Sequence, residues 1–230
     1  MHLAGLQKFN TIDYPGKLAA VVFTMGCNLR CPYCHNPHLV LPHCQPPEVP
    51  RDYFFSFLDT RQDQLDGVVV SGGEPTLHVG LHDFIRDIRL RGFDVKLDTN
   101  GTRPKVLHAL IEEGLLDYVA LDLKAPPHSY PEATGRTDKR ILQAVQDSVH
   151  LLRRGRVDYE LRTTVVPGLH TPQSLKALRP WVRGARRYIL QAFRPGGTLQ
   201  PDQFNEAPDP TGLELLRSSF SPWVGSFEIR

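Results

Sequence analysis

Several features are missing from this chain of 230 residues, and each absence excludes a class of protein. No apolar run approaches the roughly 20 residues that a membrane-spanning helix needs, so we expect no contact with a membrane. The first ten residues, MHLAGLQKFN, lack a charged segment followed by an apolar core, so we expect no signal peptide. The chain also shows no clear internal repeat and no low-complexity tract, which argues against a repeat protein.

The chain has no strong charge of either sign. Its 27 Lys and Arg residues against 25 Asp and Glu residues give a formal net charge of +2 with neutral histidine. The basic clusters RLRGF, LLRRGR and RGARRY are spread along the chain. Each stands where a helix would end, and positive charge interacts favourably with a helix dipole there. Without a concentrated basic stripe, we expect no nucleic-acid partner.

Cysteine is scarce, with four residues in the whole chain. Three of them, Cys27, Cys31 and Cys34, lie within MGCNLRCPYCHNP (25–37), which does not resemble a disulfide framework. We therefore expect a reducing, cytoplasmic environment. The length fits one well-packed domain rather than two, and 40% apolar with 23% charged residues is typical of a globular protein.

Short runs rich in β-branched residues alternate with apolar patterns of helical period. This alternation predicts an α/β fold with right-handed βαβ units and a parallel sheet. The predicted strands are 18–24, 66–71, 94–99, 117–123, 158–166 and 187–193, and the predicted helices are 50–62, 79–91, 104–114, 138–154 and 172–183. Six such strands fit either a doubly wound sheet or a partial (β/α) barrel.

The two ends of the chain stand outside this alternation. Residues 3–17 predict a short strand or a lid before the first main strand. After residue 194, four prolines mark an irregular stretch, and a helix near 210–219 and a short strand at FEIR would close the chain. We expect a single domain, 1–230, made of an N-terminal strand or lid (1–17), a (β/α)6 core (18–193) and a C-terminal extension (194–230).

Polar and glycine-rich residues gather where the predicted strands end. MGCNLRCPYC follows the first strand, SGGEPT follows the second, DTNG ends the third and DLKAP ends the fourth. Arg162 lies in the fifth strand and Gln191 in the sixth. The carboxyl ends of parallel strands meet at one edge, where α/β folds build their sites. We therefore predict one site at this edge.

The three crowded cysteines have the form C-x3-C-x2-C, which can surround one small inorganic group. A structural zinc ion would need a fourth ligand, and His35, His38, His43 and Cys44 stand nearby. The other interpretation is a four-iron cluster with three protein ligands, which leaves one iron open to a substrate or cofactor. Zinc would not explain why a glycine-rich turn, an acidic strand end and an arginine reach the same edge.

The motif C-x3-C-x-aromatic-C, with Tyr33 as the aromatic residue, resembles the cluster motif of radical S-adenosylmethionine (SAM) enzymes. GGEP resembles the second-strand motif of that superfamily. Residues 11–37, together with YCHN, DTNG and LDLK, are similar to glycyl-radical-enzyme activases, and above all to activating proteins of anaerobic ribonucleoside-triphosphate reductase. The resemblance implies a partial (β/α)6 TIM-like barrel of the radical SAM type with a short N-terminal extension, formed by a single radical SAM domain.

The resemblance also implies one [4Fe–4S] cluster on Cys27, Cys31 and Cys34, whose open iron chelates the amino and carboxylate groups of SAM. An electron from the reduced cluster would cleave the sulfur–carbon bond and yield a 5′-deoxyadenosyl radical. Reduced flavodoxin or ferredoxin would be the electron donor. The stretch 35–71 contains one further cysteine, Cys44, too few for a second cluster, and we interpret it as a spare thiol.

By the same resemblance, Gly72, Gly73 and Glu74 would meet the SAM amino group and Arg162 would bind its carboxylate. A guanidinium suits a carboxylate, and an unpaired charge in a β-branched strand would be costly. The alternative for Arg162 is a solvated face or a pair with Glu160. The remaining expected SAM contacts are Tyr33, Asp98, Thr99, Asn100, Lys124 and Gln191.

Two more roles follow from the resemblance. A monovalent cation near the SAM carboxylate would have as ligands Asp98, Thr99, Asp122 and the carbonyl of Ala120. Asp13 in TIDYPG resembles the Asp of a T-x-D-G-P-G segment near the target glycine, so a catalytic role is expected, although Tyr14 stands where glycine is usual. The alternative is an aspartate in an ordinary turn before Pro15.

The predicted function is that of a radical SAM activase that generates a glycyl radical on anaerobic ribonucleoside-triphosphate reductase. One alternative keeps the cofactors and changes the substrate. It covers an activase of the pyruvate formate-lyase type and a small-molecule enzyme such as 7-carboxy-7-deazaguanine synthase. An alternative of a different class is a zinc-binding module without catalysis.

Overall fold

Six parallel strands form the centre of the molecule in a computed structural model that describes residues 1–230. They follow one another in chain order within a single sheet, and their apolar runs are almost entirely buried. These strands are β2 (Ala19–Thr24), β3 (Gly67–Gly72), β4 (Asp94–Thr99), β5 (Tyr118–Asp122), β6 (Asp158–Val165) and β7 (Arg187–Ala192). All six were predicted from the sequence.

One further strand extends the sheet at each edge. β1 (Leu3–Asn10) pairs with β2 in the antiparallel direction, and β8 (Ser226–Ile229) pairs with β7 in the parallel direction. Of the segment expected as a strand or lid at 3–17, residues 3–10 form a strand and residues 11–17 form the turn that follows it. The final FEIR strand also forms. Because β1 and β8 are both edge strands, the sheet does not close on itself.

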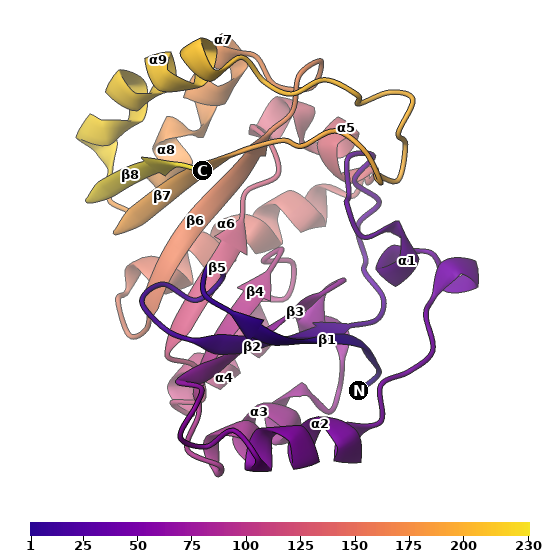
Figure 1. Cartoon of the computed structure of the whole chain (residues 1–230). Coiled ribbons are helices and arrows are strands. Elements are labelled where there is room, and N and C mark those ends of the chain that lie inside the picture. The colour runs from indigo at the N-terminus through magenta and orange to yellow at the C-terminus, as the bar shows by residue number, and fades with distance from the viewer.

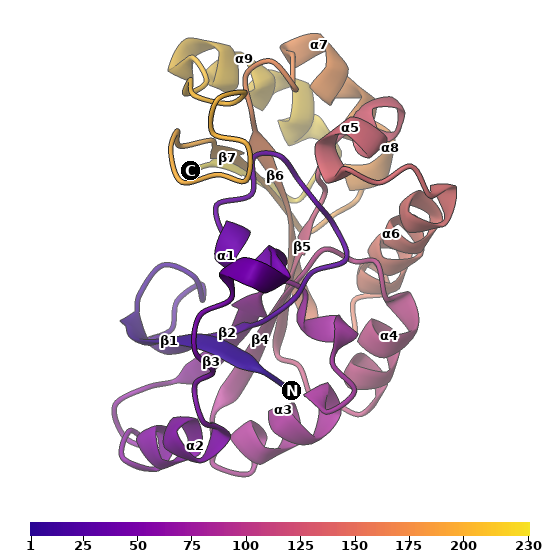
Figure 2. The ribbon, with the colours of Figure 1, turned by 90° about the vertical axis from the view of Figure 1, so that its right-hand side faces the viewer.

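Helices cover one face of the curved sheet, as Figures 1 and 2 show. The first four that pack there are α2 (Arg51–Asp59), α3 (Leu81–Arg89), α4 (Pro104–Glu112) and α6 (Lys139–Arg153). They form because apolar residues recur at helical spacing. In α3, for example, the buried residues are Leu81, Phe84, Ile85 and Ile88. The result confirms the α/β partial barrel, with helices outside and an open inner face.

The predicted helix 172–183 is broken into three pieces. They are α7 (Pro172–Leu175), the 3-10 turn η4 (Lys176–Leu178) and α8 (Arg179–Val182). Pro180 has no N–H group to donate to the preceding turn, and its ring clashes with the carbonyl four residues earlier. A continuous helix through this position was therefore a wrong expectation. The later helix α9 (Pro210–Phe220) lies where it was predicted.

Short elements that the sequence analysis did not predict lie in the connections. They are α1 (Pro37–Val40), α5 (Tyr130–Thr134) and the 3-10 turns η1 (Pro42–Cys44), η2 (Pro75–Leu77), η3 (Pro127–Ser129) and η5 (Ser221–Trp223). Elements of three to five residues are too short to leave a periodic pattern. None of the helices combines the length and the apolar character that crossing a bilayer requires.

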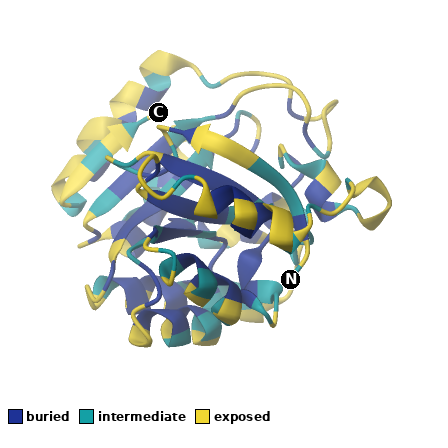
Figure 3. Ribbon diagram, turned by 60° about the horizontal axis from the view of Figure 1, so that its bottom comes forward, coloured by how far each residue is buried: buried dark blue, intermediate teal, exposed yellow.

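The two faces of the sheet carry different side chains. One large apolar cluster fills the space between the sheet and the helices, and Figure 3 shows buried strands beneath helices whose outer sides are exposed. A separate small cluster of Tyr14, Ala19, Val21 and Val69 lies on the other face, near the amino ends of the strands. Towards the carboxyl ends this inner face is polar, which leaves room for a site.

Candidate active site

A cavity of about 290 Å³ lies at the carboxyl ends of the parallel strands. It gathers nearly all residues that the sequence predicts for a site, although they come from six different strand ends. From the predicted set the lining includes Cys27, Cys31, Tyr33, Cys34, Gly72, Gly73, Glu74, Asp98, Thr99, Asn100, Asp122, Lys124, Arg162 and Gln191. The cavity does not include Asp13 or Ala120.

The first side of the cavity is the loop with the three cysteines. We call residues 25–36, together with Gly72, Gly73 and Glu74, the cysteine wall. Its backbone has little regular structure, so other contacts hold it. The Arg30 guanidinium donates to the carbonyls of Cys27 at 2.7 Å and Leu29 at 2.8 Å, and the Arg30 N–H donates to the carbonyl of Thr134 in α5 at 2.8 Å.

Two glycines let the turn after β3 touch this loop. Gly72 has a φ of 123°, and a Cβ atom there would lie 2.2 Å from the Thr24 backbone nitrogen. A Cβ atom at Gly73 would lie 2.0 Å from the Gly26 carbonyl oxygen. The N–H groups of Gly73 and Glu74 donate to the carbonyls of Thr24 at 2.9 Å and Gly26 at 2.8 Å. The close approach that these glycines permit is thus to protein backbone at the start of the cysteine loop.

Glu74 is fully buried and ties the end of β3 to the end of β4. Its carboxylate accepts hydrogen bonds from the Thr76 N–H at 3.1 Å, the Thr76 hydroxyl, the Thr99 hydroxyl at 2.8 Å and the Asn100 N–H at 2.7 Å. Burial raises the pKa of Glu74 above its usual value, although these hydrogen bonds oppose the change. The side chain therefore acts first as an internal brace of the cysteine wall.

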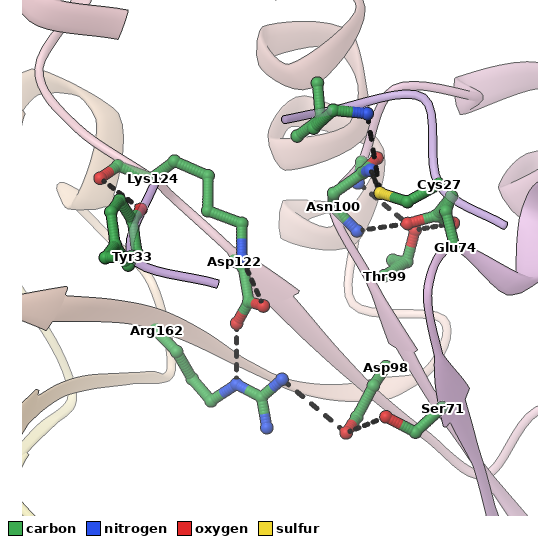
Figure 4. A network of polar contacts seen from close by, with 12 residues as sticks. Cys27, Tyr33, Ser71, Glu74, Asp98, Thr99, Asn100, Asp122, Lys124 and Arg162 are labelled. Atoms are coloured by element: carbon green, nitrogen blue, oxygen red, sulfur yellow. Dashed lines mark hydrogen bonds and ion pairs between the residues drawn. The ribbon is translucent and has the colours of Figure 1, made fainter. Parts of the chain in front are cut away.

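Asn100 joins the end of β4 to the first cysteine. Its Nδ2 lies 3.9 Å from the Cys27 Sγ and donates to the Asn28 side-chain oxygen at 3.0 Å. Its own side-chain oxygen accepts from the Thr102 N–H at 3.0 Å and the Thr102 hydroxyl at 2.7 Å. Figure 4 shows Asn100, Thr99 and Glu74 grouped around Cys27. These amide and hydroxyl contacts hold the cysteine wall without ion pairs.

The donor set fits an iron–sulfur cluster better than a single metal ion. All three thiols are free of disulfides and line the same cavity, but no three His, Cys, Asp or Glu side chains lie close enough to hold one ion. A four-iron cube separates its thiolate ligands more widely than one zinc ion does. Burial raises the pKa of Cys27 to about 11 and that of Cys31 to about 12, so a bound group must displace thiol protons. Cys44 is exposed and lies outside the cavity.

The second side of the cavity consists of charged side chains from β4, β5 and β6. Asp98, Asp122, Lys124 (just after β5) and Arg162 line the cavity, and Lys96 lies buried behind Asp98; we call these five residues the charged wall. The Arg162 Nε donates to Asp122 Oδ1 at 2.9 Å, and its terminal nitrogen NH2 lies 3.6 Å from Asp98 Oδ2. Figure 4 shows Arg162 between these two carboxylates. The outer-face alternative for Arg162 therefore does not apply.

Two lysines complete the charged wall. Lys96 Nζ lies 2.5 Å from Asp98 Oδ1, and Lys124 Nζ donates to Asp122 Oδ2 at 2.9 Å. Although burial favours neutral carboxyl groups, Arg162 and Lys96 lower the pKa of Asp98. Arg162 and Lys124 likewise hold the pKa of Asp122 well below its usual range despite burial. Both carboxylates are therefore ionised at neutral pH.

A buried acid lies on β6 below Arg162. Glu160 accepts a hydrogen bond from the Tyr118 hydroxyl at 3.0 Å, while its Oε1 has no hydrogen-bond partner. That oxygen lies 3.9 Å from both Arg162 NH1 and Arg230 NH1. The pair with Glu160 that the sequence left open for Arg162 is thus present at long range, beside the closer contact to Asp122.

Tyr33 and His170 connect the two walls from behind. The Tyr33 hydroxyl donates to the Lys124 carbonyl at 3.3 Å, and the His170 Nε2 lies 3.1 Å from the same oxygen. The Val166 N–H donates to His170 Nδ1 at 3.1 Å, so the histidine proton sits on Nε2 and points at Lys124. Burial lowers the pKa of His170 to about 4, although the Lys124 carbonyl opposes this. The histidine is neutral at pH 7.

Sequence reasoning missed several polar residues of this site. Ser71, Asn28 and Thr164 belong to it or touch it, and Lys96 is fully buried beneath Asp98. The alternation of side chains along a strand could have revealed this lysine, because residues two apart point to the same face. Lys96 and Asp98 lie two apart in DVKLDT and must share a face. The pattern of charge on one face of β4 could have found Lys96.

Asp13 lies apart from the cavity. It belongs to the turn between β1 and β2, at the amino end of β2, whereas the cysteine loop leaves the carboxyl end of that strand, as Figure 1 shows. Its carboxylate accepts from Asn10 Nδ2 at 2.7 Å, and its N–H donates to Asn10 Oδ1 at 2.7 Å. The structure does not bring Asp13 to the cysteines, and its catalytic role stays a prediction.

In comparison with known protein families, the model of the radical SAM superfamily matches residues 21–173. A candidate glycyl-radical enzyme activating enzyme of Methanocaldococcus jannaschii is 36% identical over 219 residues, which cover 93% of this chain and 88% of that protein. The pyruvate formate-lyase-activating enzyme of Staphylococcus aureus is 32% identical over 152 residues, which cover 61% of this chain and 60% of that enzyme.

Two solved structures with bound SAM have a similar fold. Streptococcus suis SuiB bound to S-adenosylmethionine gives a TM-score of 0.67 with 13% identity, over 90% of this chain and 48% of SuiB. The protein anSMEcpe with bound AdoMet gives a TM-score of 0.58 with 19% identity, over 87% of this chain and 58% of that protein. The chain thus spans about half the length of these two proteins, and at such low identity the likeness shows the fold alone.

Proposed function

Since the chain belongs to the radical SAM superfamily, we propose that it is a glycyl-radical-enzyme activase whose partner is an anaerobic ribonucleoside-triphosphate reductase. The observation that carries this proposal is the single cavity that three free thiols and a buried guanidinium line together. The activase class is supported by the identity to the M. jannaschii protein over 93% of this chain. The choice of the reductase rests on the motifs in residues 11–37.

Cys27, Cys31 and Cys34 would hold a [4Fe–4S] cluster. When bound, such a cluster supplies the electron that cleaves the sulfur–carbon bond of SAM, while the protein supplies binding, orientation and exclusion of water. The cysteine wall serves this purpose because its backbone is fixed by Arg30 and by the turn at Gly73. The iron–sulfur cluster is favoured over a zinc-binding module, because no three His, Cys, Asp or Glu side chains lie close enough to hold a single ion.

Arg162 is the best-placed group for the carboxylate of SAM. Its side chain is 11% exposed and lines the cavity. Of its nitrogens, only Nε is at hydrogen-bond distance from a carboxylate, because the two terminal nitrogens lie 3.6 Å and 3.9 Å from Asp98 and Glu160. Terminal N–H groups without a close partner can bind a second carboxylate in the paired geometry that guanidinium favours.

Gln191 is proposed for the nucleoside end of SAM. It lines both the main cavity and a smaller adjoining one of about 260 Å³ with His35, Thr164 and Arg194. A side-chain amide offers a donor and an acceptor, which suits the edge of a base. The two cavities meet at Gln191, so a molecule longer than the main cavity has space to extend past it.

The open sheet suits a macromolecular substrate. Both β1 and β8 are edge strands, so a protein loop can enter between the sheet edges without crossing a closed barrel wall. A glycyl-radical enzyme presents its target glycine on the polypeptide, and the activase must therefore accept a protein segment. We propose reduced flavodoxin or ferredoxin as the electron donor.

The test is a glycyl-radical assay. The reconstituted protein is mixed under anaerobic conditions with SAM, reduced flavodoxin and the reductase, and the radical is measured by electron paramagnetic resonance (EPR). We expect the doublet of a glycyl radical, and none from a reductase whose target glycine is replaced by alanine. Formation of 5′-deoxyadenosine without a doublet would overturn the choice of partner, whereas no 5′-deoxyadenosine would overturn the radical chemistry.

The same assay applies to a second candidate partner, pyruvate formate-lyase, because of one specific similarity. The pyruvate formate-lyase-activating enzyme of S. aureus is 32% identical over 152 residues. A doublet on pyruvate formate-lyase, and none on the reductase, would keep the activase function and change its partner. Product analysis without either enzyme tests the remaining alternative, a small-molecule substrate.

A further inference from the structure

Lys96 is a charged residue in a place where charge is rare. Its side chain is 0% exposed, and its ammonium lies 2.5 Å from Asp98 Oδ1. The residue lies on the inner face of β4, two positions before Asp98, but it does not line the cavity. An ion so deeply buried is costly unless it is paired. Asp98 is its partner, and the two side chains form an ion pair in which Asp98 lines the cavity and Lys96 lies behind it.

Both carboxylates of the charged wall already have protein partners on each oxygen. Asp98 has Lys96 on Oδ1 and the Ser71 hydroxyl on Oδ2 at 3.1 Å. Asp122 has Arg162 on Oδ1 and Lys124 on Oδ2, both at 2.9 Å. These are the two carboxylates that the family resemblance implies as ligands of a monovalent cation. In this chain the charge that such a cation would neutralise is already neutralised.

The other implied ligands are engaged as well. The Thr99 hydroxyl donates to Glu74 at 2.8 Å and accepts from the Gly101 N–H at 3.1 Å. Ala120 lies inside β5 and is in register with Asp98 on one side and Glu160 on the other. The residues present therefore do not fit an additional monovalent cation.

We propose that the ammonium of Lys96 takes the place of a bound monovalent cation, so that this protein binds SAM without Na⁺ or K⁺. Three cationic side chains of the charged wall face two carboxylates. Glu160 adds a negative charge 3.9 Å from Arg162, and Arg230, also 3.9 Å from Glu160, adds a positive one, so one positive charge is left for the carboxylate of SAM. A further cation would add unpaired charge to a buried site, and its desolvation would not be repaid.

Lys96 acts through Asp98 and is a positioning residue. Its ammonium is buried against Asp98 and does not line the cavity, so it contacts the ligand only through that carboxylate. With Asp98 neutralised from below, Arg162 keeps its terminal nitrogens free and does not have to close on that carboxylate. The inference rests on SAM binding in this cavity and is independent of which enzyme receives the radical.

The test compares the reconstituted protein with Lys96→Met and Lys96→Arg in potassium and in choline buffers of equal ionic strength. SAM affinity is measured from the change in the EPR signal of the reduced cluster, and bound Rb⁺ is measured by equilibrium dialysis. We expect the wild type to bind SAM equally in both buffers and to hold no Rb⁺. For Lys96→Met we expect SAM affinity to fall by about tenfold in choline and to recover in potassium, with Rb⁺ bound.

Lys96→Arg keeps the charge, and we expect it to stay independent of the cation. The proposal is overturned if the wild type holds one Rb⁺ per chain and loses SAM affinity in choline. It is also overturned if Lys96→Met behaves as the wild type in both buffers. Should Lys96→Met not fold, the two wild-type measurements decide. A wild type that binds SAM in neither buffer contradicts the proposed function instead, so the two failures are distinguishable.

Discussion

The cysteine wall is held by backbone contacts and hydrogen bonds without ion pairs, whereas the charged wall is held by ion pairs between side chains. In the cysteine wall, the turn at Gly72 and Gly73 lies against backbone atoms with no space for a Cβ atom. In the charged wall, Arg162 spans Asp98 and Asp122 with lysines on the far oxygens. The two walls meet around one cavity of about 290 Å³.

The difference indicates that the two walls depend on different properties. A metal cluster needs three thiolates at fixed separations, so shape matters most on the cysteine side, and rigid backbone contacts provide it. A small zwitterionic ligand needs a fixed charge at one point, and ion pairs provide that on the other side. We therefore expect steric changes in the first wall to reduce iron binding and charge changes in the second wall to reduce SAM affinity.

The largest effect is expected from Gly73→Ala. Its Cβ atom would lie 2.0 Å from the Gly26 carbonyl oxygen, so the cysteine loop must move. We expect the free energy of unfolding to fall by more than about 3 kcal/mol and iron content after reconstitution to fall with it. Thermal unfolding and iron and sulfide analysis measure both. In the control, Gly5→Ala, the Cβ atom meets only a Phe23 ring carbon at 3.6 Å, and we expect no loss.

Arg162→Gln removes charge from the other wall and leaves the shape of the cysteine loop intact. Two carboxylates lose their bridge, and SAM loses its expected anchor, so we expect SAM affinity to fall by about 100-fold while iron content is kept. Equilibrium binding with labelled SAM measures the change. The control is Arg140→Gln, an exposed residue that pairs only with Asp138. A loss of iron with unchanged SAM affinity would contradict the division between the walls.

Glu74→Gln affects the brace that joins β3 to β4. The carboxylate accepts four hydrogen bonds, three on Oε1 and one on Oε2, so an amide would turn an N–H group towards at least one of those donors. We expect the free energy of unfolding to fall by about 1–3 kcal/mol, measured by urea denaturation. Exposed Glu214→Gln serves as the control. A Glu74→Gln protein as stable as the wild type would show that the brace is not needed.

His170, which lies behind the charged wall, is expected to make the free energy of unfolding depend on pH. Burial lowers its pKa to about 4 from an ordinary 6.5, so between these values the unfolded chain binds a proton that the folded chain does not. The contribution of His170 to the free energy of unfolding is therefore fully present above about pH 6.5. It is lost as the pH drops towards 4, and the loss is about 2 kcal/mol at pH 5. Urea denaturation at several pH values measures this slope. His170→Gln should lack this part of the slope, and an identical slope in both proteins would contradict the assignment.

The smallest effect is expected from Cys44→Ser. Its thiol is exposed and lies outside the cavity, so neither wall depends on it. We expect iron content, SAM affinity and stability to match the wild type. The companion change Cys34→Ser should lose most of the iron, because it removes one of the three thiols that line the cavity. Loss of iron from Cys44→Ser would show that the fourth cysteine is a ligand.

The sequence predicted the parts of this molecule that local patterns determine. The six parallel strands follow from β-branched runs, and the gathering of Cys27, Gly73 and Arg162 at one edge follows from parallel pairing. The split of 172–183 was missed although Pro180 carried the signal. Its effect was hidden by apolar residues that keep a helical period on both sides.

The partners of buried charges could not be predicted, because they depend on contacts between strands. Nothing local to Glu74 shows that it accepts hydrogen bonds from Thr99 and Asn100, 25 and 26 residues later. The bridge from Arg162 to Asp122 requires the register of β5 with β6. The position of Asp13, at the amino end of β2, likewise depends on the pairing of β1 with β2, which the sequence left open.

Both walls must hold the same SAM molecule if the cavity works as proposed. Electron–nuclear double resonance on the reduced, reconstituted protein, with ¹⁷O in the carboxylate of SAM, detects whether that carboxylate reaches the open iron of the cluster. We expect a ¹⁷O coupling in the wild type and its loss or marked weakening in Arg162→Gln. An intact reduced cluster that shows no ¹⁷O coupling in the wild type, with SAM in excess, would contradict this arrangement.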